Sequence, residues 1–227
     1  MINKLPKFNM QQVAVLGLGR FGTELTKSLS ECGCEVLAVD ESEEKTNAVA
    51  EFATHTATTN VAEENNLRTL GIAEFDGVVI AIGDNIQASI ITALNCKEMG
   101  VNYIAAKAQN EKHAKVLEKI GVDYVVIPEA DTARKTARLL THPKINDLIE
   151  LAGGYGIAEI GVAEGWEGKM LSELDIRNRY RVNVLIAING KGEVDANPSG
   201  TTKLERGSKL IVGGTKKDLD ALSGKLN

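Results

Sequence analysis

Short runs of apolar residues alternate with longer amphipathic stretches along the chain as far as residue 127. The runs are typical of strands buried on both faces of a parallel sheet, and the stretches between them have the length and apolar spacing of helices. Six strand and helix units in this order predict an α/β fold with a doubly wound parallel sheet. The strands are predicted at residues 13–16, 36–39, 55–59, 77–82, 103–107 and 124–127, and the helices directly after the first strand and at 43–52, 63–70, 86–99 and 111–120.

The next amphipathic stretch begins at Pro128 and has no strand after it to complete a further unit. Small and apolar residues share one face of the predicted helix, basic residues share the other, and Pro143 is predicted to end it. We expect the small and apolar face to pack on a partner subunit or on the next domain. This face, called the small-residue stripe below, consists of Ala133, Thr136, Ala137 and Leu140.

The pattern changes after Gly153 and Gly154 to short strands separated by glycine turns. It predicts a small α+β domain with strands at 157–162, 182–188, 192–194 and 209–212 and a final helix at 216–226. A short helix is predicted at 145–151, between the two parts. The predicted organisation is therefore a first domain at 10–141, a linker at 142–154 and a second domain at 155–227.

A glycine-rich turn follows the first predicted strand, with the spacing Gly17-x-Gly19-x-x-Gly22. Gly17 suits a tight turn, Gly19 lets the backbone approach a pyrophosphate, and Gly22 lets the helix pack close to the strand. The second apolar run ends in Asp40, where a dinucleotide-binding fold places the carboxylate that holds ribose hydroxyls. The turn and the acid together predict an adenine nucleotide site, and Asp40 should disfavour the 2′-phosphate of NADP.

Arg20 lies in the first turn of the predicted helix, where a cation opposes the positive end of the helix dipole at a cost of about 0.3–1 kcal/mol. One interpretation is a solvated side chain that pairs with Glu24 one turn later. The other is that Arg20 contacts nucleotide phosphate, in its own subunit or in a neighbour's. A triphosphate carries more charge than the pyrophosphate of NAD and would need such a cation more.

Further candidates follow the other predicted strands, because the carboxyl ends of parallel strands meet at one edge of the sheet. Asn60 either contacts the base or ribose or forms a turn. Gly83 begins the loop opposite the glycine turn, and Lys107 ends the fifth strand. His55 and His113 have no serine or cysteine partner in a nucleophile motif, so both are interpreted as structural or solvated.

Composition narrows the possible partners and the compartment. The 227 residues are 43% hydrophobic and only 4% aromatic, so aliphatic residues and alanine fill the core. The net charge of -5 argues against a nucleic-acid partner. No apolar stretch approaches the roughly eighteen residues that a membrane span needs, and three cysteines fit a reducing compartment. We expect a cytoplasmic protein.

Two classes of function fit a dinucleotide-type site, since the fold alone does not fix the function. An NAD(P)-dependent oxidoreductase would need a proton donor facing the nicotinamide and a substrate pocket. Residues 155–227 offer neither by pattern. The sequence therefore favours a nucleotide-sensing regulator that is not an enzyme.

Five motifs together resemble the KtrA/TrkA family of cytosolic gating subunits of potassium uptake systems. They are Gly17–Gly22, Ala38–Asp40, Ala81–Ser89, Lys107–Asn110 and Val116–Gly121. The resemblance implies a Rossmann-like RCK N-terminal domain, a small RCK C-terminal domain, and homodimers that assemble into an octameric ring. It also implies peripheral attachment to the membrane through a KtrB- or TrkH-like potassium-translocating partner, whose gate the ring controls.

The same resemblance implies ATP, ADP and NAD(H) as candidate ligands. Glu129 would help to hold a cation, Mg²⁺, Ca²⁺ or Na⁺, near the ATP phosphates, and its alternative role is that of an acid near a helix N-terminus. The residues implied around the nucleotide are Gly17, Leu18, Gly19, Arg20, Phe21, Gly22, Asp40, Glu41, Asn60, Ile82, Gly83, Lys107 and Glu129.

A segment of the second domain is similar to one that binds cyclic di-AMP between two C-terminal domains in Gram-positive relatives. Arg177 suits a phosphate and Asn183 suits an adenine edge. The hairpin that follows has Gly192, where some members carry a larger side chain. The residues implied at this second site are Leu171, Asp175, Ile176, Arg177, Asn183 and Pro198.

Overall fold

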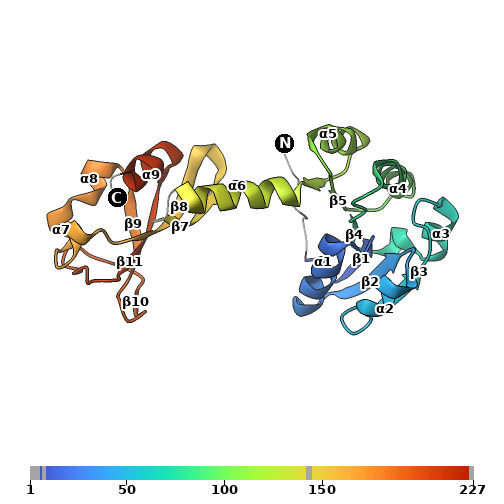
Figure 1. Ribbon diagram of the computed structural model, residues 1–227, viewed down its shortest axis with the longest axis horizontal. Helices are drawn as coiled ribbons and strands as arrows, with labels where there is room; N and C mark the ends of the chain where they lie inside the picture. The colour runs from blue at the N-terminus through green and yellow to red at the C-terminus, as the bar shows by residue number, and fades with distance from the viewer. Residues whose placement is uncertain (1–5, 7–8, 142–144, 225–227) are drawn as a thin grey trace. The chain divides into compact units, whose positions relative to one another are not determined.

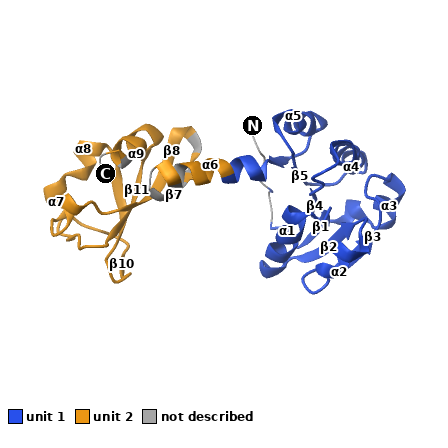
Figure 2. Ribbon diagram, viewed as in Figure 1, with its two compact units in different colours: residues 1–132 blue, residues 133–227 orange. Residues whose placement is uncertain are grey.

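The structure is a computed structural model that describes residues 6, 9–141 and 145–224. The chain divides into two compact units, residues 1–132 and 133–227, which Figure 1 shows by element and Figure 2 by unit. Within the described part of the chain, every helix is too short or too polar to cross a bilayer.

The first unit contains a six-stranded sheet in the order β3-β2-β1-β4-β5-β6, and all neighbouring strands are parallel. The predicted α/β fold is therefore confirmed. The strand order reverses between β1 and β4, which makes their carboxyl ends the switch point where ligands bind in such sheets. The strands are β1 Gln12–Leu16, β2 Glu35–Asp40, β3 His55–Thr58, β4 Gly77–Ile80, β5 Ile104–Lys107 and β6 Tyr124–Val126. The helices are α1 Arg20–Glu31, α2 Glu43–Ala48, α3 Glu64–Thr69, α4 Ile86–Glu98 and α5 Glu111–Ile120, with a short 3-10 helix at Ile72–Glu74.

Both faces of this sheet are buried, which explains the continuous apolar runs. Alternate residues of β1 divide between two clusters of buried side chains, with Val15 in one and Ala14 and Leu16 in the other. Phe21 and Leu29 of α1 pack against the smaller cluster. The larger cluster includes residues of α3, α4 and α5, so helices cover both faces of the sheet (Figure 1).

The second unit contains a five-stranded antiparallel sheet in the order β10-β9-β11-β8-β7. Helix α9 packs against β8 and β11, and Leu219 and Leu222 of this helix are fully buried in the core of the unit. The predicted small α+β domain is confirmed. The elements are β7 Ile145–Glu150, β8 Tyr155–Gly161, α7 Leu171–Leu174, α8 Ile176–Tyr180, β9 Asn183–Ile188, β10 Val194–Asp195, β11 Lys209–Thr215 and α9 Lys216–Ser223, with 3-10 helices at Ala152–Gly154 and Glu164–Trp166.

One predicted element is wrong. Residues 145–150 form the strand β7, paired antiparallel with β8, and not a helix. Most of the predicted linker at 142–154 is thus part of the second sheet or of the turn that follows it, and the division into units falls at residue 132, inside α6. Residues 225 and 226 of the predicted final helix lie outside the described residues.

Helix α6 spans Pro128–Thr141 and begins at its proline, whose missing N–H costs nothing in the first turn. All four residues of the small-residue stripe are exposed in the single chain, and Leu140 is 78% exposed. Packing of this stripe on a partner stays a prediction. Pro143, the predicted helix end, lies outside the described residues.

Candidate nucleotide-binding site

The glycine turn connects β1 to α1 at the switch point of the sheet. The N–H of Gly17 donates to the carbonyl of Val39 on β2 at 2.7 Å, and the N–H of Ala81 after β4 donates to Leu16 at 2.7 Å. These two bonds tie the turn to the ends of both neighbouring strands. The turn is therefore held in place before any ligand arrives.

Each glycine of the turn has a different reason to lack a side chain. Gly17 has φ +101°, which L-residues with a side chain rarely adopt, and a Cβ there would lie 3.0 Å from the backbone of Ala81 and Ile82. A Cβ on Gly22 would collide with the carbonyl oxygen of Gly17. Gly19 is different, since a Cβ there would meet no atom within 4 Å. The space in front of Gly19 is open on the side where a pyrophosphate would approach.

The N-terminus of α1 has the properties of an anion site. Its N-cap is Gly19, which offers no side-chain hydrogen bond, and its first turn contains no acidic residue. The first N–H groups of a helix have no partner within the helix and carry the positive end of its dipole. A phosphate in front of Gly19 would satisfy these groups.

Arg20 is exposed at the start of α1. Glu24, its alternative partner, instead accepts a hydrogen bond from Lys27 at 3.0 Å. Among the described residues no ion-pair partner of Arg20 lies within 4 Å, yet its charge is close enough to help lower the pKa of Glu129. Among the residues that the structure describes, Arg20 is thus a cation without an ion-pair partner, at a helix N-terminus that would stabilise an anion.

Asp40 ends β2 and binds the glycine turn directly. Its Oδ2 accepts the N–H of Leu18 at 2.7 Å, and its Oδ1 accepts the N–H of Ser42 at 3.0 Å. The ammonium of Lys45 lies 3.3 Å from both oxygens. Burial alone would raise the pKa of Asp40, but the two backbone N–H groups and Lys45 outweigh it and lower that pKa. Asp40 is therefore ionised at neutral pH, as a ribose-binding carboxylate must be.

An ion pair between Lys107 and Glu129 lies across the switch point from Asp40. Lys107 at the end of β5 donates to the carboxylate of Glu129 at 2.8 Å, and this bond lowers the pKa of Glu129. The side chain of Lys107 is only 14% exposed, whereas that of Glu129 is 67% exposed. The Gln109 amide donates to the carbonyl of Gly83 at 2.6 Å, which joins the loops after β4 and β5. An anion and a cation are thus paired where phosphates and a counter-ion would lie.

The remaining predicted residues are placed less directly. Leu18 is buried, Phe21 packs against the smaller core cluster, Ile82 packs against the larger one, and Glu41 is exposed. Asn60 uses its side-chain oxygen to accept the N–H of Ala62 at 2.8 Å, which is the geometry of a turn.

Neither His55 nor His113 has a catalytic arrangement in the described structure. His55 is exposed on β3. His113 is buried, its Nδ1 accepts the N–H of Gln109 at 3.2 Å, and burial lowers its pKa. Among the residues that the structure describes, three or more metal-binding side chains do not gather at any point, so a cation at Glu129 would need other ligands, such as phosphate oxygens or water.

The residues implied for cyclic di-AMP lie in the second unit. Asp175 has φ +47° between α7 and α8 and accepts a hydrogen bond from the amide of Asn178 at 2.7 Å. Arg177 and Asn183 are exposed, and Pro198 is half-buried. Ile176 is 3% exposed, whereas Leu171 is half-buried and packs against the core of the unit.

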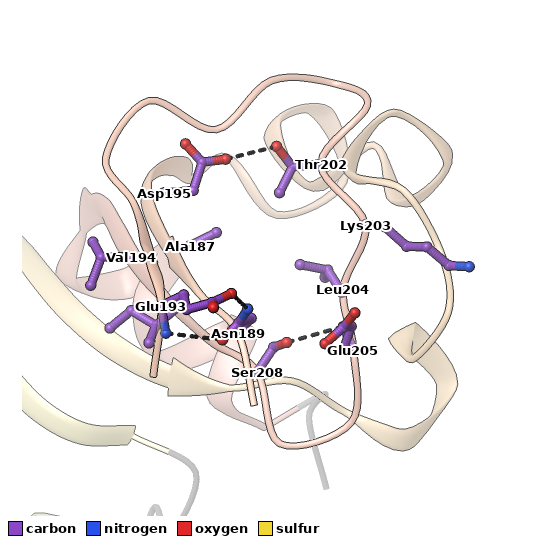
Figure 3. A pocket seen from close by; sticks show the side chains of 11 residues that line it. Ala187, Asn189, Glu193, Val194, Asp195, Thr202, Lys203, Leu204, Glu205 and Ser208 are labelled. Carbon is purple, nitrogen blue, oxygen red and sulfur yellow. Dashed lines mark hydrogen bonds between the residues drawn. The ribbon is translucent and has the colours of Figure 1, made fainter. Parts of the chain in front are cut away.

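A hollow of about 260 Å³ in the second unit is a separate feature (Figure 3). It is lined by residues of β9 and β10 and by the loop before β11, and none of the six implied residues lines it. Two of its three carboxylates accept hydrogen bonds from neighbouring side chains: Glu193 from the amide of Asn189 at 2.6 Å, and Asp195 from the hydroxyl of Thr202 at 3.1 Å. The hollow therefore does not coincide with the predicted second site.

The sequence analysis did not predict three polar residues near the site. Ser42 and Lys45 contact Asp40, and Gln109 forms a hydrogen bond with Gly83. Ser42 and Lys45 lie two and five residues after Asp40, and that short spacing was an available signal. Gln109 offered no such signal, because its partner is 26 residues away in the chain.

Two family models match this chain. The TrkA-N domain matches residues 13–128 and the TrkA-C domain matches residues 157–227. The Ktr system potassium uptake proteins C and A of Bacillus subtilis (strain 168) are each 42% identical over 209 residues, which cover 92% of this chain and 94% of each relative. The Ktr system potassium uptake protein A of Vibrio alginolyticus is 36% identical over 216 residues, covering 95% of this chain and 96% of that protein.

Solved structures agree on the fold. The crystal structure of the GsuK RCK domain covers 99% of this chain with a TM-score of 0.65 and 19% identity, and this chain spans 49% of that chain. The GsuK channel bound to NAD gives the same TM-score and identity, and this chain spans 41% of it. At this identity the likeness shows a shared fold. The two domain matches and the extended identity to the Ktr proteins show that the chain belongs to the KtrA/TrkA family.

Proposed function

We propose that this protein is a cytosolic, nucleotide-binding subunit that regulates a membrane potassium transporter and catalyses no reaction itself. The observation that carries the proposal is the preformed anion site at α1, with Asp40 on one side and Lys107 and Glu129 on the other, in a chain of this family. Potassium transport is proposed as the regulated process because the relatives are named as potassium uptake proteins. The nucleotide site supplies a means of control.

ATP and ADP are the proposed ligands, with NAD(H) as a competitor for the same adenosine pocket. Asp40 would hold the ribose, the glycine turn the inner phosphates, and Lys107 and Arg20 the outer ones. Glu129 would share a Mg²⁺, Ca²⁺ or Na⁺ ion with the phosphates of ATP. Cyclic di-AMP is the proposed ligand of the second domain, through Arg177 and Asn183.

The proposed assembly is a homodimer that repeats into an octameric ring on a KtrB- or TrkH-like membrane subunit. Two features support subunit packing: the exposed small-residue stripe of α6, and the Arg20 cation at the start of α1. The ring would attach the protein peripherally to the membrane. A ligand would act on the transporter only if it contacts two ring conformations differently.

Titration calorimetry of the purified protein against ATP, ADP, NADH, NADPH and cyclic di-AMP tests the binding part of the proposal. We expect saturable binding of ATP and ADP and weak binding of NADPH, whose 2′-phosphate meets Asp40. The alternative function, an oxidoreductase, predicts turnover of reduced nicotinamide with small carbonyl compounds. Such turnover would contradict the regulatory role.

Replacing Asp40 by alanine should weaken ATP binding by about ten-fold or more, because the ribose loses its acceptor and the N–H of Leu18 loses a charged partner (~1.5–3 kcal/mol for such a bond). Calorimetry measures the affinity and urea unfolding measures the stability. Asp76→Ala is a matched control, since Asp76 also accepts two backbone N–H groups, at Gln11 and Gln12. Unchanged ATP affinity in Asp40→Ala would show that the ribose assignment is wrong.

A further inference from the structure

The carboxylate of Asp40 has no acceptor position left for a ribose. An ionised carboxylate offers about four lone-pair sites. Oδ2 accepts from Leu18 and Lys45, and Oδ1 accepts from Ser42 and Lys45. Ribose hydroxyls can therefore bind Asp40 only if one of these donors leaves.

The three donors differ in how readily they can leave. The N–H of Leu18 belongs to the glycine turn, and the N–H of Ser42 precedes the first turn of α2, so both are fixed by the backbone. Lys45 reaches Asp40 through a long side chain that is 50% exposed, while the Asp40 side chain is only 11% exposed. Breaking this contact returns the Lys45 ammonium to water and leaves Asp40 its two backbone N–H donors, so it costs less than breaking either backbone hydrogen bond. Lys45 is the donor that can leave.

Lys45 lies in an exposed, acidic segment of the chain. Glu41, Glu43 and Glu44 are exposed on the same short segment of chain as Lys45. A displaced ammonium would enter water, and these three glutamates lie within four residues of it in the chain. Its removal from Asp40 leaves no buried charge without a partner.

We propose that Lys45 is a specificity-determining residue of the nucleotide site, which occupies the ribose position on Asp40 and must be displaced by the ribose hydroxyls of an adenine nucleotide. The inference rests on the proposed function, because it assumes that ADP places its ribose at Asp40. Lys45 therefore reduces the binding free energy that the two ribose hydroxyls contribute when they reach Asp40. A nucleotide without these hydroxyls leaves Lys45 on Asp40.

The test compares ADP with 2′,3′-dideoxy-ADP on the full-length protein by titration calorimetry. The ratio of the two dissociation constants isolates the contribution of the ribose hydroxyls to binding. Both ligands carry the same phosphates, so long-range electrostatic effects on the two are the same. In Lys45→Met the ADP ribose no longer competes with an ammonium, so the preference for ADP should rise by about 1.5- to 5-fold over the wild type. In Lys45→Arg the preference should fall below that of the wild type, because a guanidinium pairs with a carboxylate through two parallel hydrogen bonds.

Lys27→Met is the matched control, since it removes the same charge from an ion pair with Glu24 on α1. Its preference for ADP should equal that of the wild type. An unchanged or smaller preference in Lys45→Met, with ADP still bound, would overturn the role of Lys45 and leave the proposed function standing. Failure of the wild-type protein to bind ADP would overturn both.

Discussion

Replacing Gly22 by alanine will abolish measurable nucleotide binding and lower the free energy of unfolding by about 1–3 kcal/mol, the usual range for forcing a methyl group into filled space. The new Cβ collides with the carbonyl oxygen of Gly17 and lies 3.1 Å from the Cβ of Ala81. Neither neighbour can move freely, because Gly17 and Ala81 are hydrogen-bonded to β2 and β1. Urea unfolding followed by circular dichroism, and calorimetry with ADP, measure the two effects.

Gly19→Ala is the matched control for this collision. Gly19 has φ -68° and open space in front of it, so the variant should keep its stability to within about 1 kcal/mol. Its ADP affinity should still fall by about ten-fold, because the methyl group lies where the pyrophosphate would approach. A Gly22→Ala protein as stable as the wild type, or a Gly19→Ala protein with unchanged ADP affinity, would contradict this account of the turn.

Replacing Arg20 by alanine should leave folding and ADP binding intact and reduce the preference for ATP over ADP by about ten-fold, the value of one hydrogen bond to a charged group. Arg20 has no internal carboxylate partner among the described residues and opposes its own helix dipole, so its loss costs the fold nothing. Only ATP offers a γ-phosphate for this cation to contact. Calorimetry gives the preference, and small-angle scattering in each nucleotide reports whether the shape of the assembly still differs.

Arg68→Ala is the control for Arg20, because it removes an exposed arginine that pairs with Glu64 within α3, at 2.6 Å. It should leave both nucleotide affinities and the scattering difference as they are in the wild type. An unaltered ATP response in Arg20→Ala would remove Arg20 from the mechanism.

The local sequence pattern was sufficient to predict the fold of the first domain and its glycine turn. A strand buried on both faces is recognisable from its own residues, and the glycine turn specifies its backbone through the positive φ of Gly17 and the packing at Gly22. Asp40 could be placed because parallel strands bring their carboxyl ends to one edge. These features depend on neighbours in sequence or on a general rule of topology.

Features that depend on distant pairing were not predictable in the same way. Residues 145, 148 and 149 are apolar at helical spacing, and only pairing with β8 makes this stretch a strand. The bond from Gln109 to Gly83 likewise depends on how two loops meet. The spacing of five residues brings Lys45 near Asp40, but the contact with both carboxylate oxygens also depends on the Lys45 rotamer, which the spacing does not specify.

Potassium flux is the most direct measurement of the central claim. The protein would be reconstituted in vesicles with a KtrB- or TrkH-like potassium-translocating subunit, and uptake recorded with ATP, with ADP and without nucleotide. The account predicts that flux depends on the presence of this protein and differs between ATP and ADP, and that Gly22→Ala removes the difference. Flux that is the same in all three conditions, with ATP and ADP both bound, would contradict it.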